Sequence, residues 1–135
     1  MKELAALKEL EYLGLSDTQV TDAGLKELAG LTHLQELFLT GTGITDAGLA
    51  KLVPLTKLRT LYLSETRATD DGLKQLARLP KLEILYLGFT RISNAGVSRL
   101  AELKCLKTLN LEGADVTEEG IKKLRELLPK AEIIN

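Results

Sequence analysis

The chain has almost none of the residues on which common catalytic and metal sites depend. Among its 135 residues there is one histidine, His33, one cysteine, Cys105, and no tryptophan. A lone cysteine cannot form an intrachain disulfide. With one His and one Cys, the chain cannot supply the residues of most nucleophile–base pairs or His/Cys metal sites. We therefore expect neither an enzyme nor a resident cofactor or metal.

Two further absences narrow the range of partners. The 18 Lys and Arg are balanced by 19 Asp and Glu, for a formal net charge of -1, so the chain lacks the positive excess that binds nucleic-acid phosphates. No apolar run approaches the roughly 20 residues that span a bilayer. Residues 1–10 are charged and lack the pattern of a signal peptide. We expect no nucleic-acid or membrane partner and a cytoplasmic location.

What the chain does have is leucine at a fixed spacing of 24 residues, without any insertion. This period divides a single domain, 1–135, into five repeats. Residues 1–6 then read as the end of a preceding repeat helix, and residues 127–135 as a closing segment in which 131–135 could add a short strand. The repeats are 7–30, 31–54, 55–78, 79–102 and 103–126, and the recurring leucines are Leu7, Leu31, Leu55, Leu79, Leu103 and Leu127.

Each repeat changes its periodicity halfway. In the first half Leu37 and Leu39 alternate with Phe38, which is strand periodicity. In the second half apolar residues recur at helical spacing, as Leu73 and Leu76 do. Parallel stacking of such strand–turn–helix units would bury the leucines in one continuous core. A Thr or Ser followed mostly by an acidic or amide residue opens each predicted helix: Thr21-Asp22, Thr45-Asp46, Thr69-Asp70, Ser93-Asn94 and Thr117-Glu118.

Two features of the predicted helices need a reason. A glycine stands inside each one, at a cost of about 1 kcal/mol relative to alanine, which predicts close backbone approach between the helix and the rest of its own coil. Paired carboxylates such as Asp70-Asp71 and Glu118-Glu119 fall at helix starts, where the macrodipole stabilises negative charge. The glycines are Gly24, Gly48, Gly72, Gly96 and Gly120.

The segments LxxLxLxxT followed by [VIA]-[TS]-[DEN]-x-G-[LVI]-xxL resemble the leucine-rich-repeat family. They are most similar to the branch in bacterial repeat proteins and F-box/leucine-rich-repeat adaptors. The resemblance implies a right-handed α/β solenoid, a curved arc with a parallel sheet on its concave face and short helices on its convex face. It also implies that the concave sheet binds partner proteins. The family commonly has Asn or Cys at the strand's ninth position, where this chain has Thr18, Thr42, Thr66, Thr90 and Ala114. Because Ala114 has no hydroxyl, we expect a looser last turn.

The repeat frame places all five aromatic side chains on the concave face. With the first strand Leu counted as one, positions three, five, seven and eight should face solvent there. Tyr12 is at position three, Phe38, Tyr62 and Tyr86 are at position five, and Phe89 is at position eight. The three rings at position five should form a ladder. Such rings would stabilise the sheet, and exposed aromatics are also frequent interface anchors; the two roles are compatible.

We therefore expect a protein–protein interaction module, an adaptor or scaffold that binds a protein or peptide through this face. Asp17 and Glu112, with the glutamates among the candidate residues, make the face acidic, which suits a basic partner. Carbohydrate recognition by the rings is one alternative. Another is self-association through the N-terminal end, where Leu4 and Leu7 have no polar cap. The candidate partner-binding residues are Tyr12, Glu36, Phe38, Thr60, Tyr62, Glu65, Ile84, Tyr86, Phe89 and Asn110.

Overall fold

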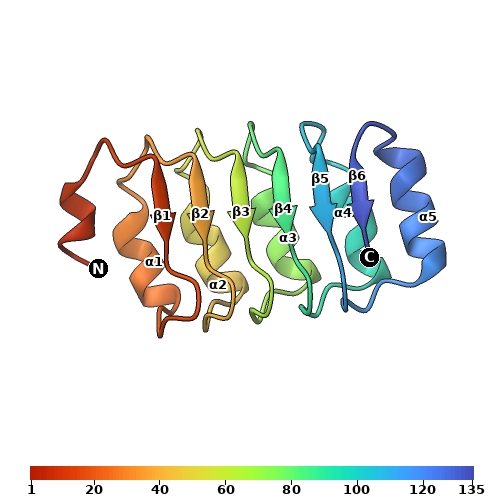
Figure 1. Ribbon diagram of the computed structural model, residues 1–135, viewed down its shortest axis with the longest axis horizontal. Coiled ribbons are helices and arrows are strands. Elements are labelled where there is room, and N and C mark those ends of the chain that lie inside the picture. The colour runs from red at the N-terminus through yellow and green to blue at the C-terminus, as the bar shows by residue number, and fades with distance from the viewer.

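A computed structural model describes all residues, 1–135, as one layer of parallel strands backed by one layer of helices (Figure 1). The six strands lie side by side in chain order, so the chain advances along the sheet one repeat at a time. The strands have three residues each: β1 (Tyr12–Gly14), β2 (Glu36–Phe38), β3 (Thr60–Tyr62), β4 (Ile84–Tyr86), β5 (Thr108–Asn110) and β6 (Glu132–Ile134).

The register of the sheet repeats without a slip. Leu37 of β2 pairs with Leu61 of β3, and every other strand residue likewise pairs with its counterpart in the next repeat. The closing segment supplies β6, where Ile133 pairs with Leu109 and is buried like the strand leucines. Equivalent positions therefore face the same side in every strand.

Short helices cover one side of the sheet, and none combines the length and hydrophobicity of a membrane-spanning helix. The predicted caps are confirmed in four repeats: the side chains of Thr45, Thr69, Ser93 and Thr117 accept backbone N–H groups of their helices, whereas Thr21 does not. The helices are α1 (Asp22–Leu28), α2 (Asp46–Leu49), α3 (Asp70–Leu76), α4 (Val97–Leu100) and α5 (Glu118–Leu127), and the 3-10 turns are η1 (Leu4–Ala6), η2 (Ala50–Leu52) and η3 (Asn94–Gly96).

The leucines form one continuous core, as the repeat period predicts. A cluster of 32 buried residues, most of them leucines, runs between sheet and helices from β1 to β6. Leu37, Leu61 and Leu85, at the centres of their strands, have no exposed surface. Because burying one such side chain contributes roughly 1.5–3 kcal/mol, this repeated layer supplies most of the drive to fold.

The helix-start carboxylates connect each repeat to the next. Asp22 Oδ1 accepts the backbone N–H of Thr45 at 2.8 Å, and its Oδ2 accepts the Thr45 hydroxyl at 2.6 Å. The explanation by the macrodipole alone is therefore incomplete, because these side chains reach beyond their own helix. The same pair of bonds joins Asp46 to Thr69 and Asp70 to Ser93, and Asn94 bonds Thr117 through its amide group.

These carboxylates also explain the glycine inside each helix. A Cβ on Gly48 would collide with the Asp22 carboxylate of the preceding repeat. The prediction that each helix approaches its own coil is therefore incomplete. The nearest group is a side chain from the repeat before, and an atom of the same coil, Ile44 Cγ2, also lies 3.1 Å from a Cβ on Gly48. Gly24 has no such side chain in front of it, and Met1 packs there instead. The other colliding pairs are Gly72 with Asp46, Gly96 with Asp70, and Gly120 with Asn94.

The threonines at the ninth position act within their own turn. The Thr42 hydroxyl donates to the Leu39 carbonyl at 2.6 Å, and Thr18, Thr66 and Thr90 make the equivalent bond. In the last repeat the backbone N–H of Ala114 donates to the Leu111 carbonyl at 3.0 Å. In this turn a backbone N–H thus takes the place of the threonine hydroxyl as the partner of the carbonyl.

We predict that Asp22→Ala lowers the free energy of unfolding by about 2–3 kcal/mol, because two hydrogen bonds to a charged group are lost. Gly48→Ala, which would ordinarily favour a helix by about 1 kcal/mol, should destabilise the protein. In the Asp22→Ala background the collision with the carboxylate is absent and Ile44 Cγ2, at 3.1 Å, is the close atom that remains, so Gly48→Ala should cost less than it does in the wild type. Urea denaturation of the two single variants and the double variant measures this coupling.

Asp71→Ala is the matched control for this cycle. Asp71 is also an acidic residue in the first turn of a helix, but it is exposed and its ion pair is with Lys74 of the same helix, at 3.1 Å. Its replacement should cost under about 1 kcal/mol. Additive losses from Asp22→Ala and Gly48→Ala would contradict the proposed link between the two residues.

Candidate partner-binding site

Aromatic rings stand in a row on the side of the sheet that faces away from the helices, here called the strand face. The ring centroids of Tyr12 and Phe38 are 5.0 Å apart, those of Phe38 and Tyr62 4.7 Å, and those of Tyr62 and Tyr86 4.2 Å. The last two rings are nearly parallel, at 6°. The predicted three-ring ladder is confirmed and gains a fourth ring. We call Tyr12, Phe38, Tyr62 and Tyr86 the aromatic stripe.

Tyr12 joins the stripe because Gly14 leaves a place for its ring. Gly14 occupies the ring position of β1 but has no side chain, and a Cβ there would lie 3.6 Å from the Tyr12 hydroxyl oxygen. The Tyr12 ring therefore leans over Gly14 toward Phe38. Sequence reasoning put Tyr12 on the right face but outside the ladder, and the signal that it missed was the glycine two residues later.

The stripe lies on a core that is complete without it. Leu37, Leu61 and Leu85 beneath the rings are fully buried. Phe38, Tyr62 and Tyr86 are half-buried, because each covers a face of its neighbour, and Tyr12 at the end of the row is 59% exposed. Ring edges, rather than open ring faces, therefore form most of the surface of the stripe.

Crowding within the stripe affects the ionisation of Tyr62. Burial raises the pKa of its phenol above the ordinary value of 10.0, and the neighbouring Tyr86 and the negative charge of Glu36 raise it further. All three effects disfavour the phenolate. The neutral hydroxyl of Tyr62 is therefore the form that the folded stripe stabilises.

Phe89 lies beside the stripe rather than in it. Its position in the repeat is the turn that ends the strand, with φ of 54°, and Asp17 and Glu65 have the same left-handed backbone. Glycine fills this place in the other two repeats, where φ is also positive. The Phe89 ring is 60% exposed and lies against Gly113, since a Cβ there would be 2.5 Å from a ring carbon.

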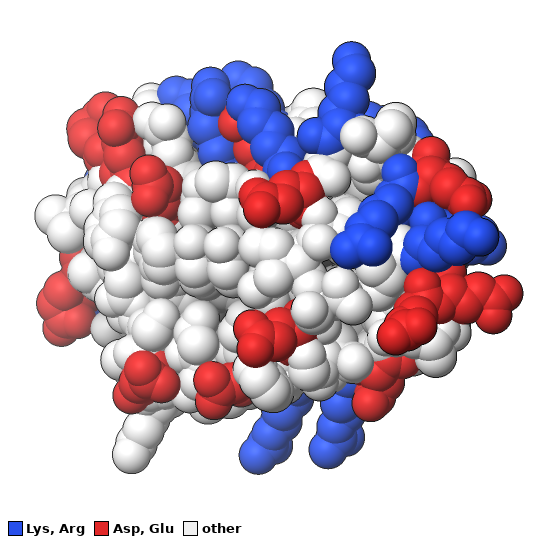
Figure 2. Space-filling view, turned by 45° about the vertical axis from the view of Figure 1, so that its right-hand side comes forward, with Lys and Arg blue, Asp and Glu red and all other residues white.

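The carboxylates of the strand face have no cationic partner. Glu36 and Glu132 at position three, Glu112 at position seven, and Asp17 and Glu65 at the strand-ending turn are exposed and form no ion pair. Figure 2 shows a band of uncharged atoms with acidic side chains on both sides of it, and basic side chains along the upper edge, at the right-hand end and at the lower edge. The strand face is therefore acidic around an aromatic centre.

The edge where the strands begin differs, because it holds a paired carboxylate, Glu83. Glu83 accepts from Lys107 at 2.7 Å and from Arg59 at 3.2 Å. The hydrogen bond from Lys107 is the main reason why the pKa of Glu83 lies below its usual range. Arg59 and Lys107 at this edge are thus engaged with the same acid. Of the remaining candidate residues, Thr60 and Ile84 are half-buried beside the stripe, and Asn110 follows Tyr86 in the row.

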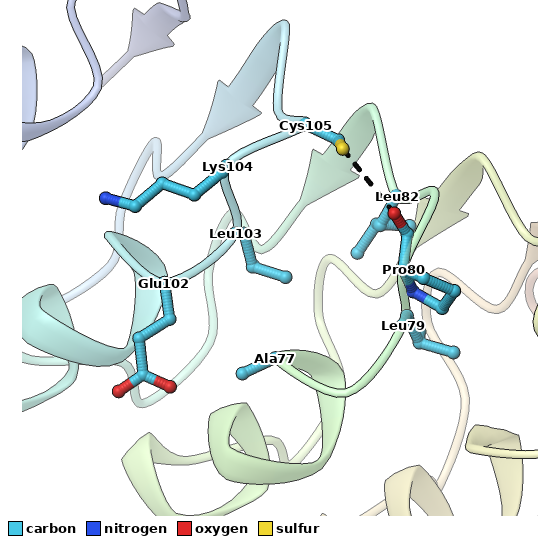
Figure 3. Close-up of a pocket in the computed structure, with 8 residues that line it drawn as sticks. All are labelled: Ala77, Leu79, Pro80, Leu82, Glu102, Leu103, Lys104 and Cys105. Atoms are coloured by element: carbon cyan, nitrogen blue, oxygen red, sulfur yellow. Dashed lines mark hydrogen bonds between the residues drawn. The ribbon is translucent and has the colours of Figure 1, made fainter.

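His33 and Cys105 lie away from the stripe, in the turns that precede their strands. His33 Nδ1 lies 3.2 Å from the Lys8 carbonyl oxygen, and Cys105 Sγ donates to the Pro80 carbonyl at 3.5 Å. Each thus contacts the preceding repeat at the equivalent place. Cys105 also borders a pocket of about 140 Å³ lined mainly by apolar side chains (Figure 3). No group of three His, Cys, Asp or Glu side chains is arranged to hold a metal ion.

Parallel strands on one side, short helices on the other and a constant step between units define an α/β solenoid with an open strand face. A family model described as "Leucine-rich repeat region" matches residues 1–135. The chain belongs to the leucine-rich-repeat family, whose fold generally mediates protein–protein interaction and whose members are typically non-enzymatic binding scaffolds.

Solved structures agree with this assignment and confirm the predicted fold. The leucine-rich-repeat protein LIC12759 of Leptospira interrogans is similar over 100% of this chain, with 30% identity and a TM-score of 0.77. Internalin C2 of Listeria monocytogenes is similar over 96%, with 27% identity and a TM-score of 0.73. The chain spans 33% and 62% of those two proteins, respectively. No curated protein matches it.

We predict that Tyr62 makes stability depend on pH at high pH. Because its folded pKa is raised above that of the unfolded chain, the stability that it contributes is complete below about pH 10 and is lost as pH rises through the folded pKa. The urea midpoint of the wild type should therefore fall relative to that of Tyr62→Phe between pH 8 and pH 11. The difference between the two urea midpoints at pH 8 controls for loss of the hydroxyl. If this difference stays constant from pH 8 to pH 11, the prediction is contradicted.

Proposed function

We propose that the chain binds a protein or peptide partner on the strand face, with the aromatic stripe at the centre of the interface. The observation that carries this proposal is the row of four adjacent rings above a core that is complete without them. Exposed aromatic side chains that the core does not require are the usual anchors of protein interfaces.

An extended peptide segment suits the dimensions of the stripe. Three strand spacings of about 4.8 Å give a row roughly 14 Å long from Tyr12 to Tyr86. A peptide that rises about 3.3 Å per residue would cross this row with four or five residues. Its apolar side chains could pack on the ring edges while its polar groups meet Glu36 and Glu65 on either side.

The ring geometry disfavours carbohydrate recognition, the first alternative. A sugar stacks on an open ring face, but the rings of Tyr62 and Tyr86 are 4.2 Å apart and nearly parallel, so they cover one another. Tyr12, at the end of the row, and Phe89, beside it, are the two rings with large exposed surfaces. Peptide side chains that contact ring edges fit this arrangement better than a sugar ring does.

We predict that Phe38→Ala/Tyr62→Ala/Tyr86→Ala weakens peptide binding on the order of 100-fold, since three anchors at about 1 kcal/mol or more each are lost. The probe is a set of peptides selected from a random display library on the immobilised wild-type chain, with affinities then measured by titration calorimetry. Circular dichroism checks that the variant is folded.

The matched control for this triple variant is Lys26→Ala/Lys51→Ala/Lys122→Ala, which truncates three exposed side chains on the helix side. It should bind the selected peptides as the wild type does. Peptides that bind the folded aromatic variant as tightly as the wild type would remove the stripe from the interface.

Self-association through the N-terminal end is a second candidate, supported by Leu7. Its side chain is 51% exposed, whereas the equivalent Leu31 and Leu55 are fully buried. If this surface joins two copies, the sedimentation coefficient should rise with protein concentration, and Leu7→Lys should abolish the rise. A coefficient that does not change with concentration would refute the candidate.

A further inference from the structure

The aromatic stripe stops at β5, where Asn110 stands in place of a ring. In the row of paired residues Tyr86 is followed by Asn110 and then by Ile134 of β6. The Asn110 side chain bends along its own strand, since its Oδ1 accepts the backbone N–H of Glu112 at 3.0 Å. The ring of Tyr86 therefore has an aromatic neighbour on one face alone. We call the space above Asn110, between Tyr86 and Ile134, the Asn110 gap.

The Asn110 gap corresponds to one step of the row of rings. The rings of the stripe stand 4.2–5.0 Å apart, one to each strand. The gap occupies the place of one strand in the same row, with the half-buried Ile134 on its far side. A flat group at that place would stand beside Tyr86, on the side away from Tyr62, at the step that separates the existing rings.

The carboxylates around the gap favour a positively charged ligand. Glu112 stands two residues after Asn110 on the same face, and Glu132 pairs in register with Thr108, two residues before it. Both carboxylates are exposed and neither is in an ion pair. Lys107, which leads into the same strand, is bound to Glu83 at 2.7 Å. Two free carboxylates thus flank a slot that has an aromatic wall.

We propose that the Asn110 gap receives an arginine side chain of the peptide partner, so that the partner is a basic peptide. This inference rests on the proposed function and specifies its ligand. The guanidinium group is planar and always charged, stacks on aromatic faces, and binds a carboxylate through two parallel hydrogen bonds. In the gap it would stack beside Tyr86, on the side away from Tyr62, and pair with Glu112, which precedes the Gly113 that the exposed Phe89 ring lies against.

The first experiment replaces arginine by citrulline, its neutral isostere, in the peptides selected on the wild-type chain. We expect the replacement at one position to weaken binding to the wild type at least tenfold. The same replacement should cost less than threefold on Glu112→Gln, because the carboxylate that pairs with the charge is gone. Glu119→Gln, which neutralises an exposed carboxylate on α5, is the matched control and should show the full tenfold loss.

The second experiment fills the gap from within the chain. Asn110→Tyr should place a fifth ring beside Tyr86 and weaken binding of the arginine peptides at least tenfold. Lys26→Tyr, which adds a ring on the helix side, controls for the extra aromatic residue. The tripeptide acetyl-Gly-Arg-Gly-amide should shift the ring proton resonances of Tyr86 and Phe89 in the wild type and not those of Asn110→Tyr, whereas acetyl-Gly-Glu-Gly-amide should shift neither.

The outcomes separate this inference from the proposed function. Selected peptides that require the aromatic stripe, yet bind equally well with citrulline in place of every arginine, would overturn the arginine site and leave the proposed function standing. Enrichment of acidic peptides, or unchanged affinity on Asn110→Tyr, would overturn it too. Peptides that bind the triple alanine variant as tightly as the wild type would refute the proposed function itself.

Discussion

The contact between a helix-start carboxylate and the capping residue of the next repeat is the constraint on which the solenoid depends. Asp22 binds both the backbone N–H and the hydroxyl of Thr45, and its carboxylate occupies the place of a side chain on Gly48. One group thus satisfies the start of the following helix and fixes how closely that helix approaches. Since each bond spans 23 residues, an insertion between the two partners would break the connection as well as the register.

Equivalent side chains line up on the strand face because the chain advances by the same step in every repeat. Because every strand pairs with the next in the same register, a residue type that recurs at one position becomes a row of touching side chains. A change at that position has an immediate geometric consequence. Gly14 admits the ring of Tyr12 into the row, whereas Asn110 turns toward the backbone of Glu112 and ends it. The residue at the ring position of each strand therefore determines whether the row of rings continues there.

The period of the sequence was enough to predict the repeats, the strands, the caps and the ladder from Phe38 to Tyr86, because these depend on equivalent positions recurring. It could not predict contacts between non-equivalent positions of neighbouring repeats. The reach of Asp22 to Thr45 and the lean of Tyr12 over Gly14 are of this kind. The left-handed turn at Phe89 was missed for another reason, because two polar residues and two glycines share its place with a bulky ring.

The distribution of charge separates paired carboxylates at the edge of the sheet from unpaired carboxylates on the strand face. Glu83 at the edge of the sheet is satisfied by Lys107 and Arg59, whereas Glu36, Glu65 and Glu112 on the strand face have no such partner. Because surface charges are screened over about 8 Å, these carboxylates act mainly on a ligand that comes into contact with them. The rings between them are already held in place by stacking, so a ligand would lose little side-chain entropy in ordering them. Under the proposed function, a cationic group of the partner would meet carboxylates that no side chain of the chain itself neutralises.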